Sequence, residues 1–172
     1  MSFFSGVWPF LLTLAGQVQN SAIGTGIRES DWTFPLIETA HVLGLTLSVG
    51  TLVWFDLRLL GVVMRHQTVS EIHKQVMPWA LIGFFIMMVS GVFLLWSEAL
   101  RCLTSIWFQL KVIALILAGA NALIFELTTQ KSIAEWDKSP VPPLKARMAG
   151  LLSIILWVGV IAAGRATAYN LF

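Results

Sequence analysis

Charged residues are scarce in this sequence, and their scarcity is the first constraint on what the protein does. Only 12% of the 172 residues are charged, whereas 57% are hydrophobic. A typical soluble domain carries about 25% charged residues, so the composition places the chain among membrane proteins. The formal net charge is only +2, which is too small to indicate a nucleic-acid partner.

Cysteine is almost absent as well, since Cys102 is the only one in the chain. A single cysteine excludes an internal disulfide and any metal or redox motif built on paired cysteines. The sequence also lacks a phosphate-binding loop, a dinucleotide-binding glycine fingerprint, a G-x-S-x-G turn and an H-E-x-x-H motif. Motifs therefore leave open whether the protein is an enzyme.

Four long apolar segments dominate the sequence, each long enough to cross about 30 Å of hydrocarbon as a helix. They run approximately over residues 34–63, 78–97, 105–127 and 146–169. Short connections between them make consecutive segments antiparallel. We therefore predict an all-α membrane protein, with an antiparallel four-helix transmembrane bundle over residues 31–172.

Residues 1–30 form a separate segment ahead of the predicted bundle. Its apolar stretch, at residues 6–16, is too short to span the hydrocarbon core of a bilayer. We expect this segment to form an amphipathic interfacial helix that lies on the membrane. A short additional span is the alternative, and it would move only the N-terminus to the other side.

Basic residues are distributed unequally between the two ends of the predicted helices, and this asymmetry predicts their orientation. Seven of the eleven lysines and arginines lie in or beside two connections, the one between the first and second spans and the one between the third and fourth. These connections should be cytoplasmic, which puts the C-terminus outside. The protein would then be a multi-pass protein of the bacterial inner membrane.

Four ionisable residues fall at one depth, near the predicted outer ends of the spans. At about 1.5 Å of rise per residue, Glu38 and His41 of the first span reach the level of Lys111 and Arg165. A carboxylate three residues from a histidine is a common way to orient a metal-bound imidazole. Neighbouring basic groups suit an anionic ligand. Haem b therefore fits, with His41 on the iron and Lys111 and Arg165 on the propionates.

Other ligands and roles would use the same residues. His41 and Lys111 suit hydrogen bonds to the carbonyls of a quinone, and His41 suits copper, although copper sites usually draw on more imidazole or sulfur ligands. A further alternative is a non-catalytic subunit of a larger membrane complex, or a homo-oligomer, in which these groups make interhelical or partner contacts. Haem b binding for membrane redox chemistry is the leading hypothesis.

A second pattern of charges predicts how the first and fourth spans pack. Glu38 and Asp56 are 18 residues apart, and so are Arg147 and Arg165; this spacing is a whole number of helical turns. Because the two spans run antiparallel, Glu38 would meet Arg165 and Asp56 would meet Arg147. An isolated charge in hydrocarbon costs at least about 2.5 kcal/mol. We therefore expect two ion pairs that clamp these helices at both ends.

Family resemblance rests on three stretches: ESDWTFPLIETAHVLGLTLSVGTLVWFDLRLLG, WFQLKVIALILAGANALIFE and ARMAGLLSIILWVGVIAAGRATAY. Together they resemble an uncharacterised bacterial family of small four-helix membrane proteins, which implies this fold but no particular activity. In layout the chain is more distantly similar to the bacterial membrane protoporphyrinogen oxidase, which binds haem b, and to the copper-resistance D membrane domain. The first similarity rests on His41 and Lys111. The chain departs from it at Glu126, where a further histidine would complete the pattern.

Overall fold

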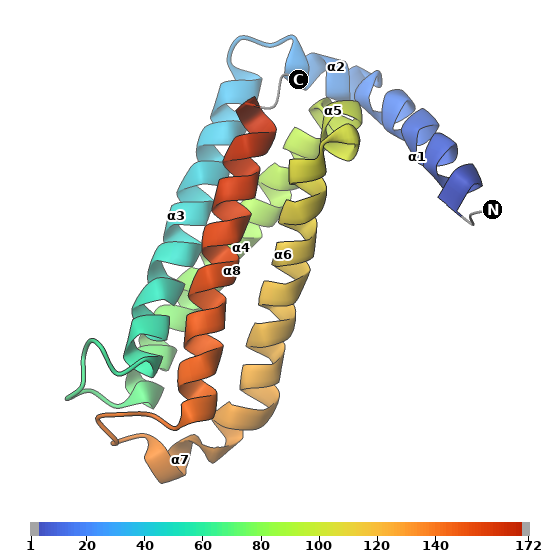
Figure 1. The fold of residues 1–172 in the computed structure, drawn as a ribbon. Coiled ribbons are helices and arrows are strands. Elements are labelled where there is room, and N and C mark those ends of the chain that lie inside the picture. Colours follow the sequence, from blue (N-terminus) through green and yellow to red (C-terminus); the bar gives the residue numbers. More distant parts are fainter. Residues whose placement is uncertain (1–3, 170–172) are drawn as a thin grey trace.

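The computed structural model describes residues 4–169, with side chains from residue 8 onward, and the regular elements in that range are all helical. Four of its helices are long and apolar enough to cross a membrane. They are α3 (Thr33–Leu59), α4 (Val69–Ser97), α6 (Ile106–Ile124) with its continuation, and α8 (Leu144–Tyr169). They form an antiparallel bundle (Figure 1). The predicted all-α membrane fold is therefore confirmed, and the chain is a multi-pass protein of a lipid environment.

Two of the spanning helices differ from their predicted bounds for local reasons. α3 ends at Leu59, short of the expected residue 63, and Gly61 just after it has φ = 73°, the left-handed conformation that commonly follows a helix. α4 begins at Val69 rather than near residue 78, because Thr68 and Glu71 form a capping box there. The connection between these two spans is therefore shorter than the sequence suggests.

The third span continues beyond the end of α6. The chain runs on as a π-helical turn over Phe125–Thr129, a 3-10 turn over Gln130–Ser132 and the short helix α7 (Ile133–Trp136). π-helical turns are rare and frequently occur at functional sites. This one lies at the end of the bundle that carries α7 (Figure 1), which we call the α7 end. The opposite end, with the short helix α5 (Ala99–Thr104) and the C-terminus, is the α5 end.

Two helices, α1 (Phe4–Gln19) and α2 (Ala22–Arg28), precede the bundle. α1 packs against α5 and the neighbouring part of α4, and it points away from the bundle (Figure 1). Ser21 caps α2 through a hydrogen bond from the Gly24 amide, and it also accepts one from Trp96 Nε1 at 3.0 Å. The interfacial position of this segment stays a prediction.

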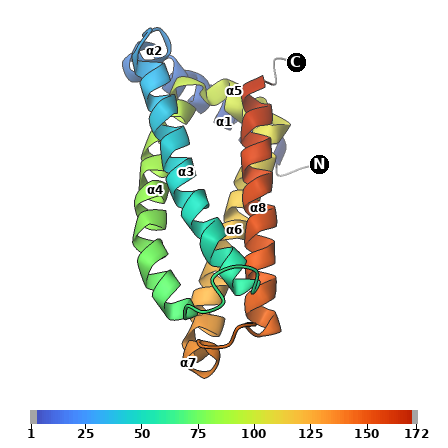
Figure 2. The ribbon, with the colours of Figure 1, turned by 90° about the vertical axis from the view of Figure 1, so that its left-hand side faces the viewer.

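α3 changes neighbours along its length, and this crossing shapes the bundle (Figure 2). From the α5 end to the middle it lies directly on α4; a Cβ added at Gly83 would stand 2.5 Å from Ser48 N and 2.7 Å from Gly44 O. At the α7 end it meets α8, where a Cβ at Gly150 would stand 3.0 Å from Asp56 O. α6 packs along α8, whereas the backbones of α4 and α6 lie farther apart.

Candidate functional site

His41 is held between α3 and α4 in the α5-end half of the bundle. Its Nδ1 lies 3.0 Å from Ser90 Oγ, and its ring lies against Gly91, where a Cβ would stand 3.1 Å from Cε1. Ser90 Oγ donates its only proton to the Ile86 carbonyl at 2.6 Å, so it accepts from His41 Nδ1–H. In a neutral imidazole this arrangement places the proton on Nδ1 and leaves Nε2 as the nitrogen with a lone pair.

Lys111 reaches the same layer from α6, at the level that its sequence position indicates. Its Cδ, Cε and Nζ all lie 3.7 Å from the place of a Cβ on Gly164 of α8. Lys111 is close enough to interact electrostatically with His41 and with Cys102. Burial raises the pKa of the Cys102 thiol, which lies in α5 outside the spans, so this cysteine is a weak nucleophile. Of the four residues of the predicted layer, His41 and Lys111 are the two that are partly buried in the bundle.

Glu38 and Arg165, the other two residues of that layer, face away from it. Both are exposed, and Arg165 donates a hydrogen bond of 2.6 Å to the Tyr169 hydroxyl, with its guanidinium 4.8 Å from the centre of that ring. In the described part of the chain, Glu38 forms no ion pair with Arg165. A step of three residues turns a side chain by about 60° around the helix. That rotation carries Glu38 from the packed face, where His41 lies, to the surface.

The second predicted ion pair is not formed either. Asp56 is 4% exposed, whereas Arg147 is exposed, and the one ion pair among the described residues joins His73 and Glu126. Asp56 lies instead against Gly150 and Ser153 of α8. A clamp at both ends requires α3 and α8 to run side by side along their whole length. Because α3 crosses from α4 to α8, it meets α8 only at the α7 end, along small residues.

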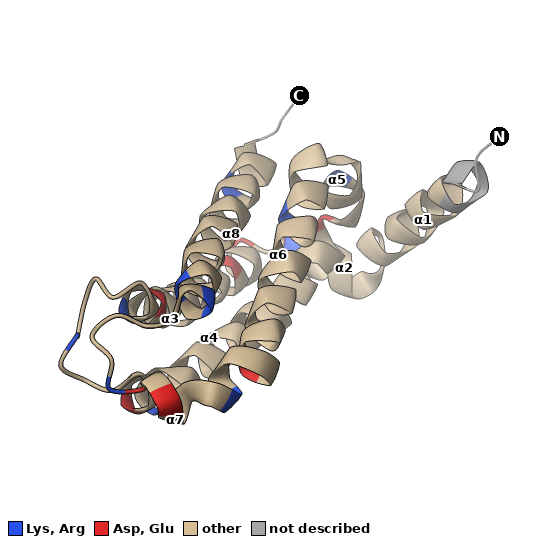
Figure 3. Ribbon diagram, turned by 60° about the horizontal axis from the view of Figure 1, so that its bottom comes forward, with Lys and Arg blue, Asp and Glu red and all other residues tan. Residues whose placement is uncertain are grey.

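Arg58 fixes the two connections at the α7 end, where charged residues gather (Figure 3). It is fully buried, and its guanidinium donates to Gln67 O at 2.9 and 3.1 Å and to Ser139 O at 3.1 Å. Asp137, in the second connection, accepts from the amide and hydroxyl of Ser70 at 2.8 and 2.7 Å. The α3–α4 and α7–α8 connections are therefore tied together across the end of the bundle.

A cavity of about 400 Å³ occupies the α7-end half of the bundle, and all four spanning helices line it. Most of its wall is apolar. The polar residues on its lining are Ser48, Asp56, Asn121, Glu126 and Ser153. A concave, mainly apolar space with a few convergent polar groups is typical of a small-molecule site. The cavity is therefore the second candidate site, beside the layer around His41.

Two of these polar side chains are deeply buried and have an oxygen atom without a partner, although the Asp56 carboxyl group also contacts the Ser153 hydroxyl. Ser48 is fully buried and Asp56 nearly so, yet neither Ser48 Oγ nor Asp56 Oδ2 has a hydrogen-bond partner within the described chain. Asn121, in contrast, donates to Ala149 O at 3.0 Å and joins α6 to α8. Buried polar groups are nearly always paired. Ser48 and Asp56 therefore differ from His41, whose Nδ1 is paired with Ser90.

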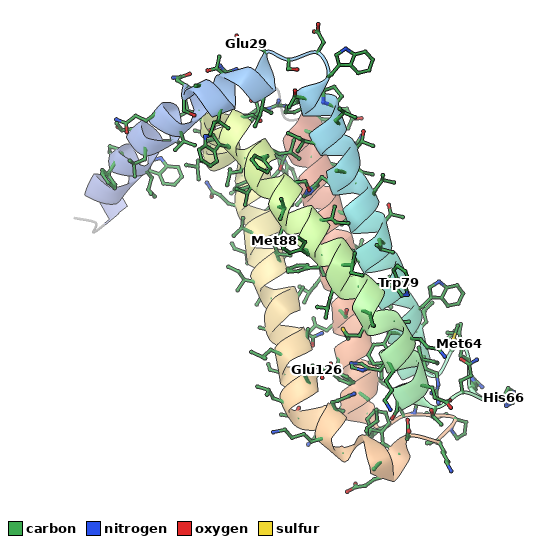
Figure 4. All side chains as sticks on the ribbon, turned by 180° about the vertical axis from the view of Figure 1, so that it is seen from behind. Glu29, Met64, His66, Trp79, Met88 and Glu126 are labelled. Carbon is green, nitrogen blue, oxygen red and sulfur yellow. The ribbon has the colours of Figure 1, made fainter. Side chains whose placement is uncertain are left out.

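The exposed part of the cavity lining lies on α4 and α6, two helices that stand apart in Figure 4. Leu81 of α4 and Leu123 of α6 line this side and are 60% and 58% exposed. At the α7 end, His73 Nε2 of α4 donates to Glu126 Oε1 at 2.7 Å and bridges the gap. Glu126 belongs to the π-helical turn. That turn therefore supplies the residue that closes this end of the opening.

Reasoning from the sequence identified Asp56 as unusual but missed the cavity beside it. A carboxylate within an apolar span is a functional candidate by default, and that signal was present. Ser48 and Ser153 carried no such signal, because serine is common in packed transmembrane helices. Which helices meet around Asp56 depends on the crossing of α3, and spacing along one helix does not encode that crossing.

The chain matches a known protein family. The match is to a family of unknown function, DUF6644, and covers residues 29–170, which include the four spanning helices, the layer around His41 and the cavity. No curated protein and no solved structure matches the chain. Because the match extends over most of its length, the chain belongs to the DUF6644 family of unknown function.

Proposed function

We propose that this membrane protein binds a small lipid-soluble molecule in the cavity of its α7-end half. The observation that carries the proposal is the pair of unpartnered buried atoms on the cavity lining, Asp56 Oδ2 and Ser48 Oγ. Leaving a buried polar atom without a partner costs about 1–3 kcal/mol, and ionisable residues within membrane spans are commonly functional. A ligand that bonds to these atoms recovers that cost when it binds.

Size and access support the same proposal. The cavity volume of about 400 Å³ falls within the range of roughly 300–1,000 Å³ that is usual for ligand pockets. The side between α4 and α6 is lined by exposed leucines, Leu81 and Leu123. A molecule dissolved in the bilayer therefore reaches the cavity without crossing a polar layer.

Photolabelling tests this proposal. The apolar probe 3-trifluoromethyl-3-phenyldiazirine forms a carbene that inserts into side chains it touches. Trp157 is a suitable target because it lines the cavity and is only 7% exposed. Gly119→Phe should fill the cavity, since Gly119 lines it and an added Cβ would meet nothing within 4 Å. We expect this variant to lose the labelling of Trp157 in nanodiscs.

The matched control is Gly159→Phe. Gly159 also lies in a spanning helix and has nothing within 4 Å of an added Cβ, but it is not on the cavity lining. This variant should keep the labelling of Trp157, and the thermal unfolding of both variants checks that they are folded. Equal labelling of Trp157 in the wild type and in both variants would overturn the proposal.

We also propose that the α7 end faces the cytoplasm in the inner membrane, with the C-terminus outside. Seven of the eleven lysines and arginines lie in or beside the connections at that end, and cytoplasmic connections are enriched in such residues. His66 is exposed in the α3–α4 connection (Figure 4). A His66→Cys variant that lacks Cys102 should react with an impermeant maleimide only after spheroplasts are lysed. Reaction in intact spheroplasts would contradict this orientation.

A second candidate function is haem b binding for membrane redox chemistry, at the layer around His41. The tautomer of His41 favours it, because the bond to Ser90 fixes Nδ1–H and leaves Nε2 free for an iron atom. Lys111 is near enough to pair with a propionate, whereas Glu38 and Arg165 face away. From residue 8 to residue 169, no three His, Cys, Asp or Glu side chains converge as a metal site. His41 would therefore be the ligand from this chain.

An optical spectrum tests the haem candidate. With protein purified from cells that have ample haem, we expect a Soret band that shifts on dithionite reduction. The band should disappear in His41→Ala and persist in Glu38→Ala, because Glu38 is exposed on the same helix. A featureless spectrum from folded wild-type protein would exclude haem. Metal analysis and quinone extraction of the same sample would then test the copper and quinone alternatives.

A further inference from the structure

The lining of the cavity is unbalanced in charge. Of its twenty residues, two are acidic, Asp56 and Glu126, and none is basic. Glu126 is already bonded to His73, so Asp56 is the acid of the lining that has no basic partner there. Arg58 is not on the lining. Its Nε and Nη2 are bonded to carbonyls of the connections, and residues two apart on a helix do not face each other.

Aromatic rings form much of the remaining wall. Phe55, Phe84, Phe125 and Trp157 all line the cavity, and the rings of Phe55 and Phe125 pack edge to face with their centroids 5.8 Å apart. The face of an aromatic ring carries partial negative charge and attracts cations. Several rings beside one carboxyl group therefore offer the surroundings in which proteins recognise substituted ammonium groups.

We infer that the ligand of this cavity is an amphipathic organic cation, a protonated amine with an apolar body, and that Asp56 is its counter-ion. This inference rests on the proposed function and adds the chemical class of the ligand. A protonated amine donates to Asp56 Oδ2, an oxygen on the lining that lacks a partner. Ser48 lies eight residues, about 12 Å, farther along α3, on the part of the lining that the apolar body of the ligand would occupy. A neutral carbonyl ligand, such as a quinone, accepts from Ser48 but leaves Asp56 without an opposite charge.

The depth of Asp56 supports this assignment. Asp56 lies one turn from the end of α3 at Leu59, close to the surface at the α7 end. Trp157 lies about 20 Å along α8 from its start, nearer the middle of the bundle. A ligand with its charge at Asp56 and its apolar body toward Trp157 keeps the orientation that an amphipathic cation has in a lipid leaflet. Entry between α4 and α6 therefore requires no reversal of the molecule.

Competition with the photolabel tests the inference with a matched pair of probes. Benzyldimethylamine is a cation at neutral pH, and isobutylbenzene has the same shape with CH in place of N–H⁺. Protection of Trp157 is titrated with each probe on the wild type, on Asp56→Asn and on Glu38→Gln, which removes an exposed acid of the same helix. Comparison between variants cancels the different partition of the two probes into lipid.

The expected shift in the half-protecting concentration follows from the loss of a buried charge pair between the amine and Asp56. Asp56→Asn should raise the concentration of benzyldimethylamine that half-protects Trp157 by at least about tenfold. The corresponding concentration of isobutylbenzene should not change, and Glu38→Gln should leave both values as in the wild type. This pattern would assign the cation to Asp56 rather than to the apolar wall or to the general negative charge of α3.

Three other results would overturn the inference, and they separate it from the proposed function. If the amine protects the wild type and Asp56→Asn equally, or if only isobutylbenzene or decylubiquinone protects, the cavity binds a ligand but Asp56 does not select a cation. If Trp157 is not labelled in the wild type, the proposed function fails as well. If Asp56→Asn does not fold, the protection of Trp157 in the wild type decides the question. Failure of benzyldimethylamine to protect Trp157 there would contradict the assignment of a cationic ligand.

Discussion

The two halves of the bundle treat buried polar side chains in opposite ways. In the α5-end half, His41 bonds to Ser90, which in turn bonds to the backbone of its own helix. In the α7-end half, Ser48 and Asp56 are more deeply buried, yet each has an oxygen without a partner in the described chain. Helix packing explains a paired polar group, whereas an unpaired one needs another cause. Hydrogen-bond partners, more than charge or depth, therefore separate a structural polar residue from a candidate ligand contact.

The path of α3 produces this difference. In the α5-end half α3 lies on α4, and the missing side chain of Gly91 makes room for the imidazole of His41. At the α7 end α3 also meets α8 at Gly150, and Phe55 still packs on His73 of α4, while the backbones of α4 and α6 remain apart. The space among the four helices is therefore open there, and Asp56 faces it from the crossing helix.

Arg58 and Arg147 provide the strongest test of which charges hold the α7 end together. Arg58→Ala removes a fully buried side chain that donates to Gln67 O and Ser139 O. Since a hydrogen bond from a charged group contributes about 1.5–3 kcal/mol, the free energy of unfolding should fall by about 3 kcal/mol or more. Arg147→Ala removes an exposed side chain and should change it by less than about 0.5 kcal/mol. Thermal unfolding in detergent measures both changes.

The opposite result would support the ion pair between Asp56 and Arg147 that the sequence predicts. If Arg147→Ala destabilises the protein as much as Arg58→Ala, Asp56 and Arg147 are paired in the membrane, and the cavity loses its uncompensated carboxyl group. Arg165→Ala is a second exposed comparison, and it removes the hydrogen bond from the guanidinium to the Tyr169 hydroxyl. Its effect should be as small as that of Arg147→Ala.

The spanning helices and the level of each charge were predictable, because both follow from local properties of the sequence. Long apolar runs identify membrane spans, and a constant rise per residue places His41 and Lys111 at one depth. The start of α4 was missed because Thr68 and Glu71 extend the helix into a polar stretch by capping it. The expected association with a larger complex or with a second copy stays a prediction.

The partners of the charges were not predictable, because they depend on contacts between helices. Glu38 and His41 differ by one small rotation about α3, and the neighbours of the helix decide which of them is packed. Asp56 was matched with Arg147 by level alone, whereas the crossing of α3 set it against Gly150. A sequence gives the height of a residue along a straight helix, but its neighbours follow from the angles between helices.

Gly83 provides the next test, because α3 and α4 pack closely against each other at this residue, near the boundary between the two halves of the bundle. In Gly83→Ala the new Cβ would stand 2.5 Å from Ser48 N and 2.7 Å from Gly44 O. These are backbone atoms that cannot rotate away, so the helices must move apart. We expect the free energy of unfolding to fall by about 2–3 kcal/mol. Because α3 would shift, labelling of Trp157 by the diazirine should also change.

Gly50→Ala is the matched control on α3, since a Cβ at Gly50 would meet nothing within 4 Å. Alanine favours a helix over glycine by up to about 1 kcal/mol, so this variant should be neutral or slightly more stable. Similar melting temperatures for Gly83→Ala and Gly50→Ala would show that α3 and α4 do not touch at this point. The crossing would then not be the cause of the cavity.

Ser90 and Ser48 allow the smallest and most direct test, because they are the same residue in the two halves. Ser90→Ala removes the acceptor of His41 Nδ1–H and should lower the free energy of unfolding by about 1 kcal/mol. Ser48→Ala removes a buried hydroxyl that has no partner in the described chain, so the ligand-free protein should be unchanged or more stable.

Thermal unfolding of both variants, with and without benzyldimethylamine, distinguishes them. Added amine should raise the melting temperature of both variants, because its single N–H group bonds to Asp56 and to neither serine. An equal loss of stability in both variants would mean that Ser48 is bonded in the membrane and that the two halves do not differ.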